Sequence, residues 1–483
     1  MNAAKQIICQ IKARYADCIL IVIWLAIAVF AMLNHELWRD ESRVWQFVNC
    51  LDFKNVIASA ASDGHPFLWY IILFPLAKLH LPVYAMQLTA CLAVFSAVCI
   101  FCFKSKFNFF IKALFVFSAG MIYFMPVMCR NYALIPPVLL WLALLYPKRT
   151  QKPYLYTFCI VLLSQTHSLM WGACAVIWIL YALECIIQSI KLNRQQKISL
   201  YAPLILFIIY SVLMINIFNS NIHNSEFYSL YENLKKSAAF DSLLSGASGI
   251  YHFVFKGFYL LKFLYIAASA ALIFYILKTD LKLFLIFIFS VSYMFFIFIQ
   301  IWFGGIYYQK FFLITLMLIF CCMIAAEKTK SIFFQSAVLF YLALNMLIFS
   351  PFEFIADSVN HHFTNTKQIS EFLLKNNIQP EEYIIIDSLY ISNETFSAYL
   401  GEYKKLNRII LYDAENFNSD AYESRITEEI NKRPQIKYLI INECFGGFIK
   451  NTKLPALITV NKSEKMKIYS FSSDEFYYLY RIQ

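Results

Sequence analysis

The sequence predicts a polytopic α-helical membrane protein that ends in a small α/β domain, and three observations support this fold class. The chain has 483 residues, of which 60% are hydrophobic and only 15% are charged. Soluble domains carry roughly 45 to 50% apolar and about 25% charged residues. Long apolar runs recur along the first three quarters of the chain, and the net charge of +11 is distributed unevenly. This pattern excludes a cytosolic enzyme, a disulfide scaffold and a disordered protein.

The excess positive charge lies in the hydrophobic part of the chain. Residues 366 to 483 hold 15 basic and 16 acidic side chains, whereas residues 1 to 365 hold 26 and 14. Membrane proteins concentrate Lys and Arg in cytoplasmic loops, so the charge indicates membrane topology and no nucleic-acid partner. Only Cys444 lies in the C-terminal region, which therefore forms no internal disulfide.

Eleven apolar runs are predicted to span the membrane, because a bilayer core of about 30 Å asks for roughly 20 apolar residues per helix. They cover residues 18 to 34, 82 to 103, 109 to 127, 131 to 146, 154 to 169, 171 to 190, 199 to 218, 252 to 277, 281 to 303, 309 to 326 and 332 to 351. We expect these helices to form one transmembrane domain, residues 1 to 351.

The basic loops predict a cytoplasmic N-terminus. Strict alternation of the spans puts 16 of the 26 basic residues of this part into short loops on one side, as the positive-inside rule requires. Residues 66 to 80 are apolar but short and contain Pro75; counting them as a span would reverse this distribution, so we interpret them as interfacial or re-entrant. We expect a multi-pass protein of the plasma (inner) membrane. Its predicted outer features are loop 35–65, loop 219–251 and the soluble domain 366–483.

The C-terminal domain alternates helix-like and strand-like stretches. In order they read TKQISEFLLKNN, EEYIIID, RIILYD, SDAYESRITEEINK and IKYLIIN. Buried strands that end in Asp or Asn between amphipathic helices predict a small α/β domain. The domain has no glycine fingerprint and no metal-ligand cluster in its sequence.

The first candidate site follows the first apolar run, in WRDESRVWQF at residues 38 to 47. Asp40 and Glu41 are adjacent carboxylates between Arg39 and Arg43, on a stretch whose aromatic residues suit an interfacial helix. Carboxylates at a membrane edge can serve as a catalytic base. The alternative interpretation is a solvated helix end, because Asp and Glu are common in loops.

Two further clusters lie in the next outer segments. SDGHPFLWY, at residues 62 to 70, places Asp63 and His65 at a turn, where they form a possible base, phosphate donor or metal-ligand pair, or an ordinary turn. Arg130 stands alone between two hydrophobic runs, with Tyr132 two residues later. An Arg in this position is costly unless it faces water or an anion, which favours a functional role.

The last candidates lie at the outer ends of later helices. His167 ends a predicted span in LLSQTHSLMWG, and Tyr308 and Lys310 begin another in GGIYYQKFFLI. A cation at a helix N-terminus suits a phosphate group. A satisfied polar histidine and a lysine that extends to the interface are the alternatives.

The order of these motifs resembles the GT-C superfamily of membrane glycosyltransferases, closest to its protein O-mannosyltransferase and aminoarabinose transferase branch. Members often read D-E-A-x-Y, D-V-H-P-P-L-Y-Y, A-R-x-Y, H-Y and R-Y-F-L. This sequence has DESRVW, DGHPFLWY, CRNYAL, THSL and YYQKFFL over residues 1 to 350. It departs from the family at Phe67, at Ser168 and at Lys310 with Phe311. Lys keeps the charge of Arg but loses bidentate phosphate recognition.

The resemblance implies an inverting glycosyltransferase that moves a sugar from a polyprenyl-phosphate donor to a lipid, glycan or protein acceptor on the outer face. It assigns catalysis to Asp40 and Glu41. Binding of the donor phosphate or substrate falls to Asp63, His65, Arg130, Tyr132, His167, Tyr308 and Lys310. A divalent metal ion held by Asp40 and Asp63 is a further expectation, and membrane lipids are expected partners.

Two other functional classes remain open from the sequence. A flippase or other transporter predicts charged residues near the bilayer midplane and paired broken helices, whereas Glu184 is the only acidic residue within a predicted span and no halves repeat. A polysaccharide polymerase or ligase would use the same donor class but usually places its catalytic loop late in the chain.

Overall fold

The computed structural model describes most of the chain as two compact units. The described residues are 2–37, 39–190, 192–222, 259–300, 307–329, 331–361, 364–388, 394–401, 408–411, 428, 430–442, 458–459 and 477–482, with the side chains of 2–10, 299–300, 307–310, 387–388, 394, 408–411 and 458–459 left out. The helical unit comprises Met1–Phe30, Phe53–Ile72 and Gln87–Phe352. The mixed unit comprises Ala31–Asp52, Leu73–Met86 and Glu353–Gln483.

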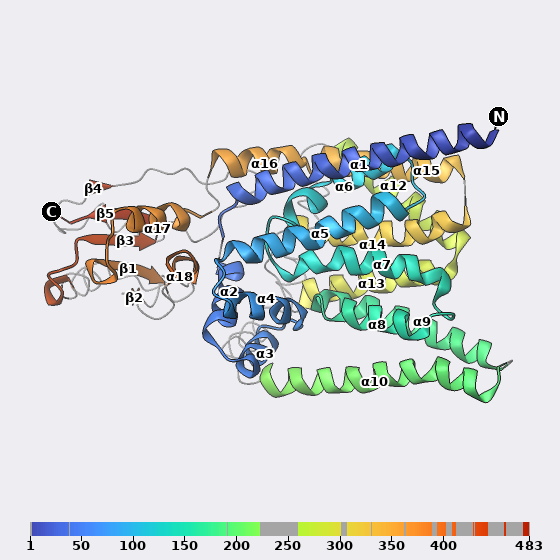
Figure 1. The fold of residues 1–483 in the computed structure, drawn as a ribbon, viewed down its shortest axis with the longest axis horizontal. Coiled ribbons are helices and arrows are strands. Elements are labelled where there is room, and N and C mark those ends of the chain that lie inside the picture. Colours follow the sequence, from blue (N-terminus) through green and yellow to red (C-terminus); the bar gives the residue numbers. More distant parts are fainter. Residues whose placement is uncertain are drawn as a thin grey trace. The chain divides into compact units, whose positions relative to one another are not determined.

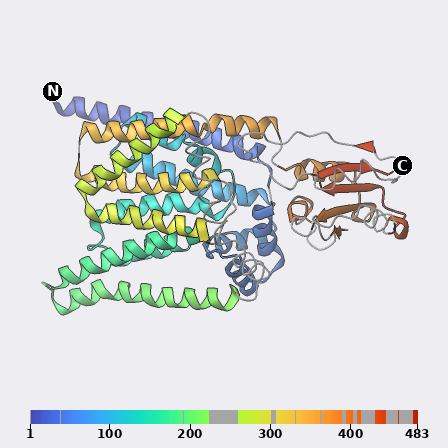
Figure 2. The ribbon, with the colours of Figure 1, turned by 180° about the vertical axis from the view of Figure 1, so that it is seen from behind.

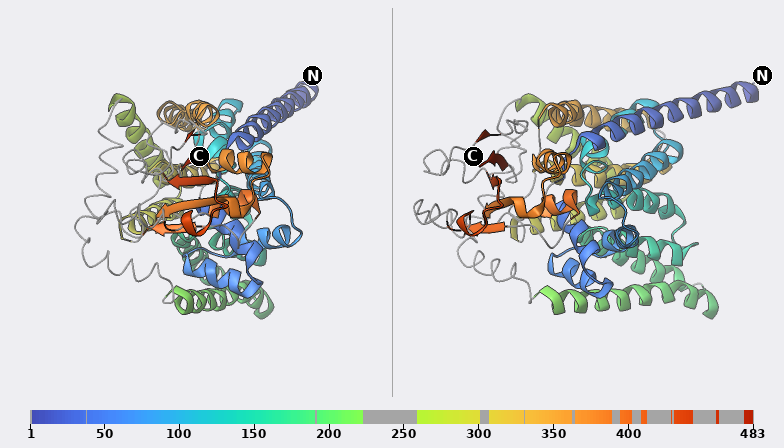
Figure 3. Two further views of the ribbon diagram at one scale, coloured as in Figure 1. Left: turned by 90° about the vertical axis from the view of Figure 1, so that its left-hand side faces the viewer. Right: turned by 60° about the vertical axis from the view of Figure 1, so that its left-hand side comes forward.

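Eight helices in the described part of the chain are long and apolar enough to cross a membrane. They are α1 (Asn2–Asn34), α5 (Tyr84–Lys104), α9 (Trp171–Ser189), α10 (Arg194–Ile222), α12 (Tyr259–Thr279), α13 (Leu281–Gln300), α14 (Tyr307–Lys328) and α15 (Ile332–Ile348). Within the helical unit they run side by side in Figures 1 and 2, and the left panel of Figure 3 views them close to end-on. The predicted polytopic α-helical membrane fold is confirmed.

The other three predicted spans fold as shorter or interrupted helices. The eleven predicted spans are therefore not all continuous helices of membrane-spanning length. The run 109–127 becomes α6 (Phe109–Val116) and a π-helical turn, η1 (Gly120–Phe124). The run 131–146 becomes η2 (Asn131–Leu134), α7 (Ile135–Leu145) and η3 (Tyr146–Lys148), and the run 154–169 becomes α8 (Pro153–Ser164).

Local geometry explains these interruptions. At Gly120 the π turn approaches α14 so closely that an added Cβ would lie 3.0 Å from Cβ of Phe312. Pro136 stands in the first turn of α7, where its missing N–H costs nothing. Since a 3₁₀ turn rises about 2 Å per residue and an α-helix 1.5 Å, the η2–α7–η3 segment extends to about 30 Å, the thickness of the bilayer core.

Burial separates a central helix from a peripheral one. In the apolar span of α14, 78% of the residues are buried within the protein, against 22% in α10. α10 lies at the edge of the bundle in every view (Figures 1 to 3). Its exposed residues between positions 205 and 215 are all apolar, including Ile205, Ile209 and Leu213, as expected for a surface that faces lipid.

Short helices follow α1. They are α2 (Arg39–Cys50), α3 (Phe53–Ser62) and α4 (Leu68–Lys78). α4 contains Pro75 and has 11 residues, a length of about 17 Å, which is too short to cross the bilayer core. This agrees with the interpretation of residues 66 to 80 as a segment that does not span the membrane.

The mixed unit contains the predicted α/β domain. Its sheet has the order β2-β1-β3-β5-β4, with β2 (Arg408–Leu411), β1 (Tyr383–Ser388) and β3 (Tyr438–Asn442) parallel. β5 (Tyr477–Arg481) and β4 (Ile458–Thr459) add an antiparallel edge that the sequence did not predict. The buried core includes Ile369, Phe396 and Ile440.

Four helical segments accompany this sheet. They are α16 (Pro351–Asn360), α17 (Thr366–Lys375), η5 (Pro380–Glu382) and α18 (Glu394–Leu400). α17, β1, β2 and β3 match predicted elements. The predicted charged helix SDAYESRITEEINK lies mostly outside the described residues.

The second outer loop begins later than predicted, because α10 continues to Ile222. The rest of the predicted loop 219–251 lies outside the described residues. The following helix, α12, begins at Tyr259, against the predicted start at residue 252.

Candidate functional site

A helix-terminating motif positions His65. The N–H of His65 donates to the carbonyl of Ala60 at 2.9 Å, and the N–H of Gly64 donates to the carbonyl of Ala61 at 3.0 Å. These are the two bonds of a Schellman motif at the end of α3. Gly64 supplies the required left-handed backbone, with φ of 73°. The Asp-Gly turn predicted at Asp63 therefore has a definite purpose: it directs His65 out of the helix.

The segment after His65 is bound to a distant linker. The N–H of Phe67 donates to Oε1 of Gln165 at 3.0 Å, across 98 residues of sequence. Gln165 lies between α8 and η4 (Ser168–Met170), and its Nε2 donates to the hydroxyl of Tyr210 in α10. Two irregular segments of the chain are thereby held together, and each carries one of the predicted histidines.

His167 is the centre of the resulting cluster. Its ring stacks on Tyr132 with a centroid distance of 4.2 Å and an interplanar angle of 30°. His65 approaches the same ring edge-on at 5.6 Å. Tyr132 itself lies in η2, the 3₁₀ turn that begins α7. Three rings from three separate motifs thus lie close together, with His167 between Tyr132 and His65.

The tautomer of His167 follows from its hydrogen bond. The backbone N–H of Leu169 donates to Nδ1 at 3.1 Å, so Nδ1 is the acceptor and a neutral ring carries its proton on Nε2. Nε2 is buried and has no hydrogen-bond partner among the described residues. A buried donor without a partner costs about 1 to 3 kcal/mol, so this position favours a ligand oxygen.

Arg130 adds a cation to the cluster. Its Cζ lies 5.6 Å from the centre of the Tyr132 ring, within cation–π range, and the residue is only 7% exposed. Its backbone is extended, with φ of −112° and ψ of 169°, and it forms the N-cap position of η2. The guanidinium, two imidazoles and a phenol ring therefore lie together in the helical unit.

Asp40 and Glu41 lie in the mixed unit, in the first turn of α2, and their surroundings differ. Glu41 is fully buried, and its two carboxylate oxygens lie 3.2 and 3.1 Å from Nε2 of His35. The Asp40 side chain is 26% exposed, with Oδ1 3.5 Å from Nε of Arg39. Of the two predicted catalytic carboxylates, Asp40 is the accessible one, whereas Glu41 is buried against the imidazole of His35.

The remaining predicted site residues are placed as follows. Asp63 is partly buried at the turn before His65. Tyr308 and Lys310 lie in the first turn of α14, but their side chains are outside the described residues. Among the described residues there is no group of three or more His, Cys, Asp and Glu side chains suited to hold a metal ion. The metal remains a prediction, and no step below depends on it.

Sequence reasoning missed three polar residues of these sites. Nε2 of His35 contacts the carboxylate of Glu41, and Gln165 binds the Phe67 backbone. Asn131 is 4% exposed, with a buried Nδ2 that has no partner in the described part of the chain. Each contacts a motif residue or stands within two positions of one in the sequence. Polar residues adjacent to the motif residues in apolar surroundings were the signal that could have found Gln165 and Asn131.

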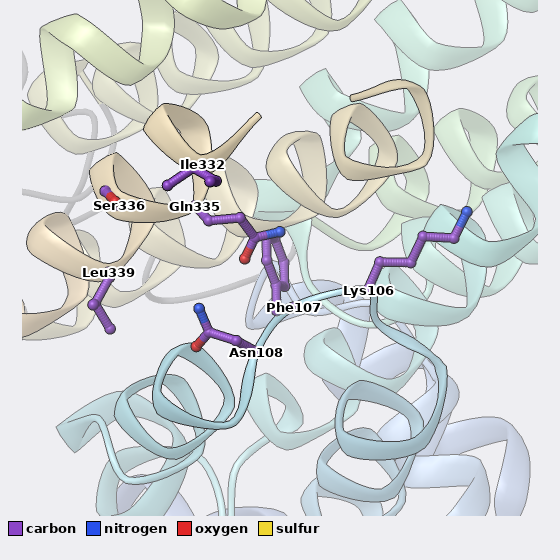
Figure 4. A pocket seen from close by; sticks show the side chains of 7 residues that line it. All are labelled: Lys106, Phe107, Asn108, Ile332, Gln335, Ser336 and Leu339. Atoms are coloured by element: carbon purple, nitrogen blue, oxygen red, sulfur yellow. The ribbon is translucent and has the colours of Figure 1, made fainter. Parts of the chain in front are cut away.

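An open pocket of about 340 Å³ lies elsewhere in the helical unit. Figure 4 shows its lining from the link between α5 and α6 and from the start of α15, including Asn108, Gln335 and Ser336. Lys106 lines it too, and its Nζ binds Glu327. None of the predicted site residues lines this pocket.

Comparison with known proteins rests on structure alone. No protein-family model matches the chain, and no curated protein sequence matches it. The crystal structure of ArnT from Cupriavidus metallidurans in the apo state is similar over 95% of this chain and 97% of that chain, with a TM-score of 0.50 and 10% identity. The fold of this chain is therefore similar to that of ArnT. The predicted resemblance is thereby confirmed for the fold.

The same enzyme bound to undecaprenyl phosphate gives a TM-score of 0.38 at 11% identity, again over 95% of this chain and 97% of that chain.

Proposed function

We propose that this protein is an inverting membrane glycosyltransferase that transfers a sugar from a polyprenyl-phosphate donor to an acceptor hydroxyl or amine. The observation that carries the proposal is the meeting of Arg130, His65, Tyr132 and His167 in a chain with a GT-C-like fold. These residues come from three motifs that are far apart in the sequence.

The cluster suits the leaving group of this reaction. As the bond between the sugar C1 and the phosphate oxygen breaks, the polyprenyl phosphate leaves as an anion and takes the bonding electron pair with it. Preorganised donors and cations stabilise such a charge. Arg130 supplies a permanent charge, and the Nε2–H of His167 supplies a buried donor that the described residues leave unused.

Asp40 is suited to activate the acceptor. An acceptor hydroxyl is a weak nucleophile, and a carboxylate that removes its proton as the new C1–O bond forms accelerates the attack. Direct displacement by the acceptor inverts the anomeric carbon and needs no covalent intermediate. We assign the base to Asp40 because its carboxylate is accessible, and we assign Glu41 to the support of α2 through His35.

The proposed topology follows the positive-inside rule. We place the N-terminus in the cytoplasm and the His167 cluster, α2 and the C-terminal domain on the outer side of the inner membrane. Cysteine labelling of intact cells tests this placement: a cysteine at position 52 is expected to react with a membrane-impermeant maleimide, whereas one at position 148 is not, in a variant whose 13 native cysteines are replaced.

The test of function is transfer of radiolabelled sugar from undecaprenyl-phosphate aminoarabinose, and from a mannosyl analogue, into acceptors present in native membranes. Asp40→Asn is expected to abolish transfer at unchanged expression. Asp52→Asn is the matched control, because Asp52 is an exposed carboxylate just beyond α2. Near-wild-type transfer by Asp40→Asn would remove Asp40 as the base. Translocation of the donor by purified protein, with no transfer, would favour a flippase.

A further inference from the structure

The segment before α2 is bound by the C-terminal part of the mixed unit. The backbone N–H of Leu37 donates to the hydroxyl of Tyr399 at 2.8 Å. The hydroxyl of Thr364 donates to the carbonyl of Leu37 at 3.0 Å. Tyr399 belongs to α18, and Thr364 precedes α17. Both polar groups of one buried peptide residue are therefore satisfied by side chains from more than 300 residues away.

These two bonds take the place of helical hydrogen bonds. Residues 35–37 lie between α1 and α2 and have no regular secondary structure, and Leu37 is 0% exposed. A buried N–H or C=O without a partner is strongly disfavoured, so the conformation here depends on Tyr399 and Thr364. Thr366 fixes the second of them, because its hydroxyl lies 2.9 Å from that of Thr364, which already donates to Leu37.

Packing and a second polar contact support the hydrogen bonds of Leu37. α18 packs directly against α2, and the two helices lie next to each other in Figure 1. Burial raises the pKa of Tyr399 well above its ordinary value, so its hydroxyl stays protonated across the pH range of an enzyme assay. From the other side, the contact between Nε2 of His35 and the carboxylate of Glu41 links the segment to the first turn of α2.

We propose that Tyr399 and Thr364 are positioning residues: by holding the Leu37 backbone they fix the start of α2, and with it Asp40, for proton abstraction. This inference rests on the proposed function. It gives the C-terminal domain a role in the reaction that the motifs do not assign to it. Neither residue is expected to touch substrate, and each acts through the backbone three residues before Asp40.

The experiment compares Tyr399→Phe and Thr364→Val with Tyr438→Phe in the full-length protein. Tyr438→Phe removes the same hydroxyl group from β3 of the same domain, at a side chain packed on the sheet core. Hydrogen exchange of the peptide that contains Leu37 and steady-state transfer are measured for each variant, with the sugar donor that the wild type accepts.

In both test variants we expect the Leu37 amide to exchange at least about tenfold faster. We also expect kcat to fall about tenfold, with KM for the donor and the shape of the pH profile unchanged; Tyr438→Phe is expected to behave as wild type. Faster exchange with full kcat would overturn the positioning role, as would unchanged exchange. Full activity of Asp40→Asn would instead overturn the proposed function, so the two failures are distinguishable.

Discussion

The two ends of the transmembrane bundle use charge in opposite ways. At one end, acidic and basic side chains neutralise each other. Oε2 of Glu184 lies 2.6 Å from Nη2 of Arg149 and 2.8 Å from Nζ of Lys282. Oδ2 of Asp280 lies 2.5 Å from Nζ of Lys328. At the other end, Arg130 gathers with His65, Tyr132 and His167. α9 separates the two, because His167 precedes it and Glu184 lies near its C-terminus, about 25 Å along the axis.

We propose that one end stabilises the fold and the other binds a ligand. A neutralised pair attracts no external ion, whereas the unused Nε2–H of His167 suits an incoming oxyanion. We call the first the paired end and the second the donor end. Substitutions at each end test this division.

Arg130→Gln at the donor end is expected to lower sugar transfer by about 10²- to 10³-fold, because it removes the cation that faces the developing phosphate charge. The melting temperature in detergent is expected to change little. The measurement is kcat of purified protein beside a thermal unfolding curve. A large loss of stability with normal kcat in the folded fraction would contradict the division.

Arg149→Gln at the paired end is the matched substitution, and it is expected to lower stability while kcat stays near wild type. Its guanidinium binds Glu184 through Nε and Nη2, and Cζ lies 4.0 Å from the ring centre of Tyr146. Removing it leaves Glu184 with Lys282 and Gln188 as partners among the described residues, and we expect a loss of about 3 kcal/mol, since truncating one partner of a buried pair is costly. Thermal unfolding tests this; kcat of the folded protein should stay near wild type.

Gly172→Ala tests the packing that supports the donor end. An added Cβ would lie 2.4 Å from Cβ of Tyr293, which cannot move without its helix, α13. Overpacking of this kind costs about 1 to 3 kcal/mol, so we expect about 2 kcal/mol in a thermal unfolding experiment. Tyr293→Gly removes this Cβ, so adding Gly172→Ala to Tyr293→Gly is expected to cost less than adding it to the wild type, which recovers part of the loss. No recovery would show that the clash is not the cause.

His167→Leu tests the unused donor directly. Loss of the Nε2–H is expected to weaken binding of undecaprenyl phosphate about tenfold, equivalent to about 1.4 kcal/mol. His167→Gln, which keeps an amide donor, is expected to lose less. Equilibrium binding of radiolabelled undecaprenyl phosphate measures both variants, and equal affinities for the two would exclude a hydrogen bond from position 167.

The meeting of Arg130, Tyr132, His65 and His167 was predictable only through the order of the motifs. No local pattern says that a residue after α3 will face a residue after α8. The structure accomplishes this with the Schellman motif at Gly64 and the bond from Phe67 to Gln165. The pairing of Glu41 with His35 was not predicted, because the sequence does not show which of two adjacent carboxylates is buried.

The sequence also failed where pairing is non-local. β5 was missed because its YYLYR stretch becomes a strand by pairing with β3, whose facing residue Asn442 is 35 positions from Tyr477. The spans 109–127, 131–146 and 154–169 were predicted as continuous helices because apolar composition does not reveal the approach of Phe312 at Gly120 or the 3₁₀ turns around α7.

The sequence by itself determined that this chain spans a membrane many times, where most of the long helices lie, and that a small α/β domain follows them. A bilayer imposes these properties locally, since every spanning segment must be apolar and satisfy its backbone within its own helix. The tertiary structure decided which of two neighbouring carboxylates is accessible, which polar residues meet at the donor end, and that Tyr399 holds the Leu37 backbone. Those outcomes depend on side-chain contacts between segments hundreds of residues apart, and no local rule fixes them.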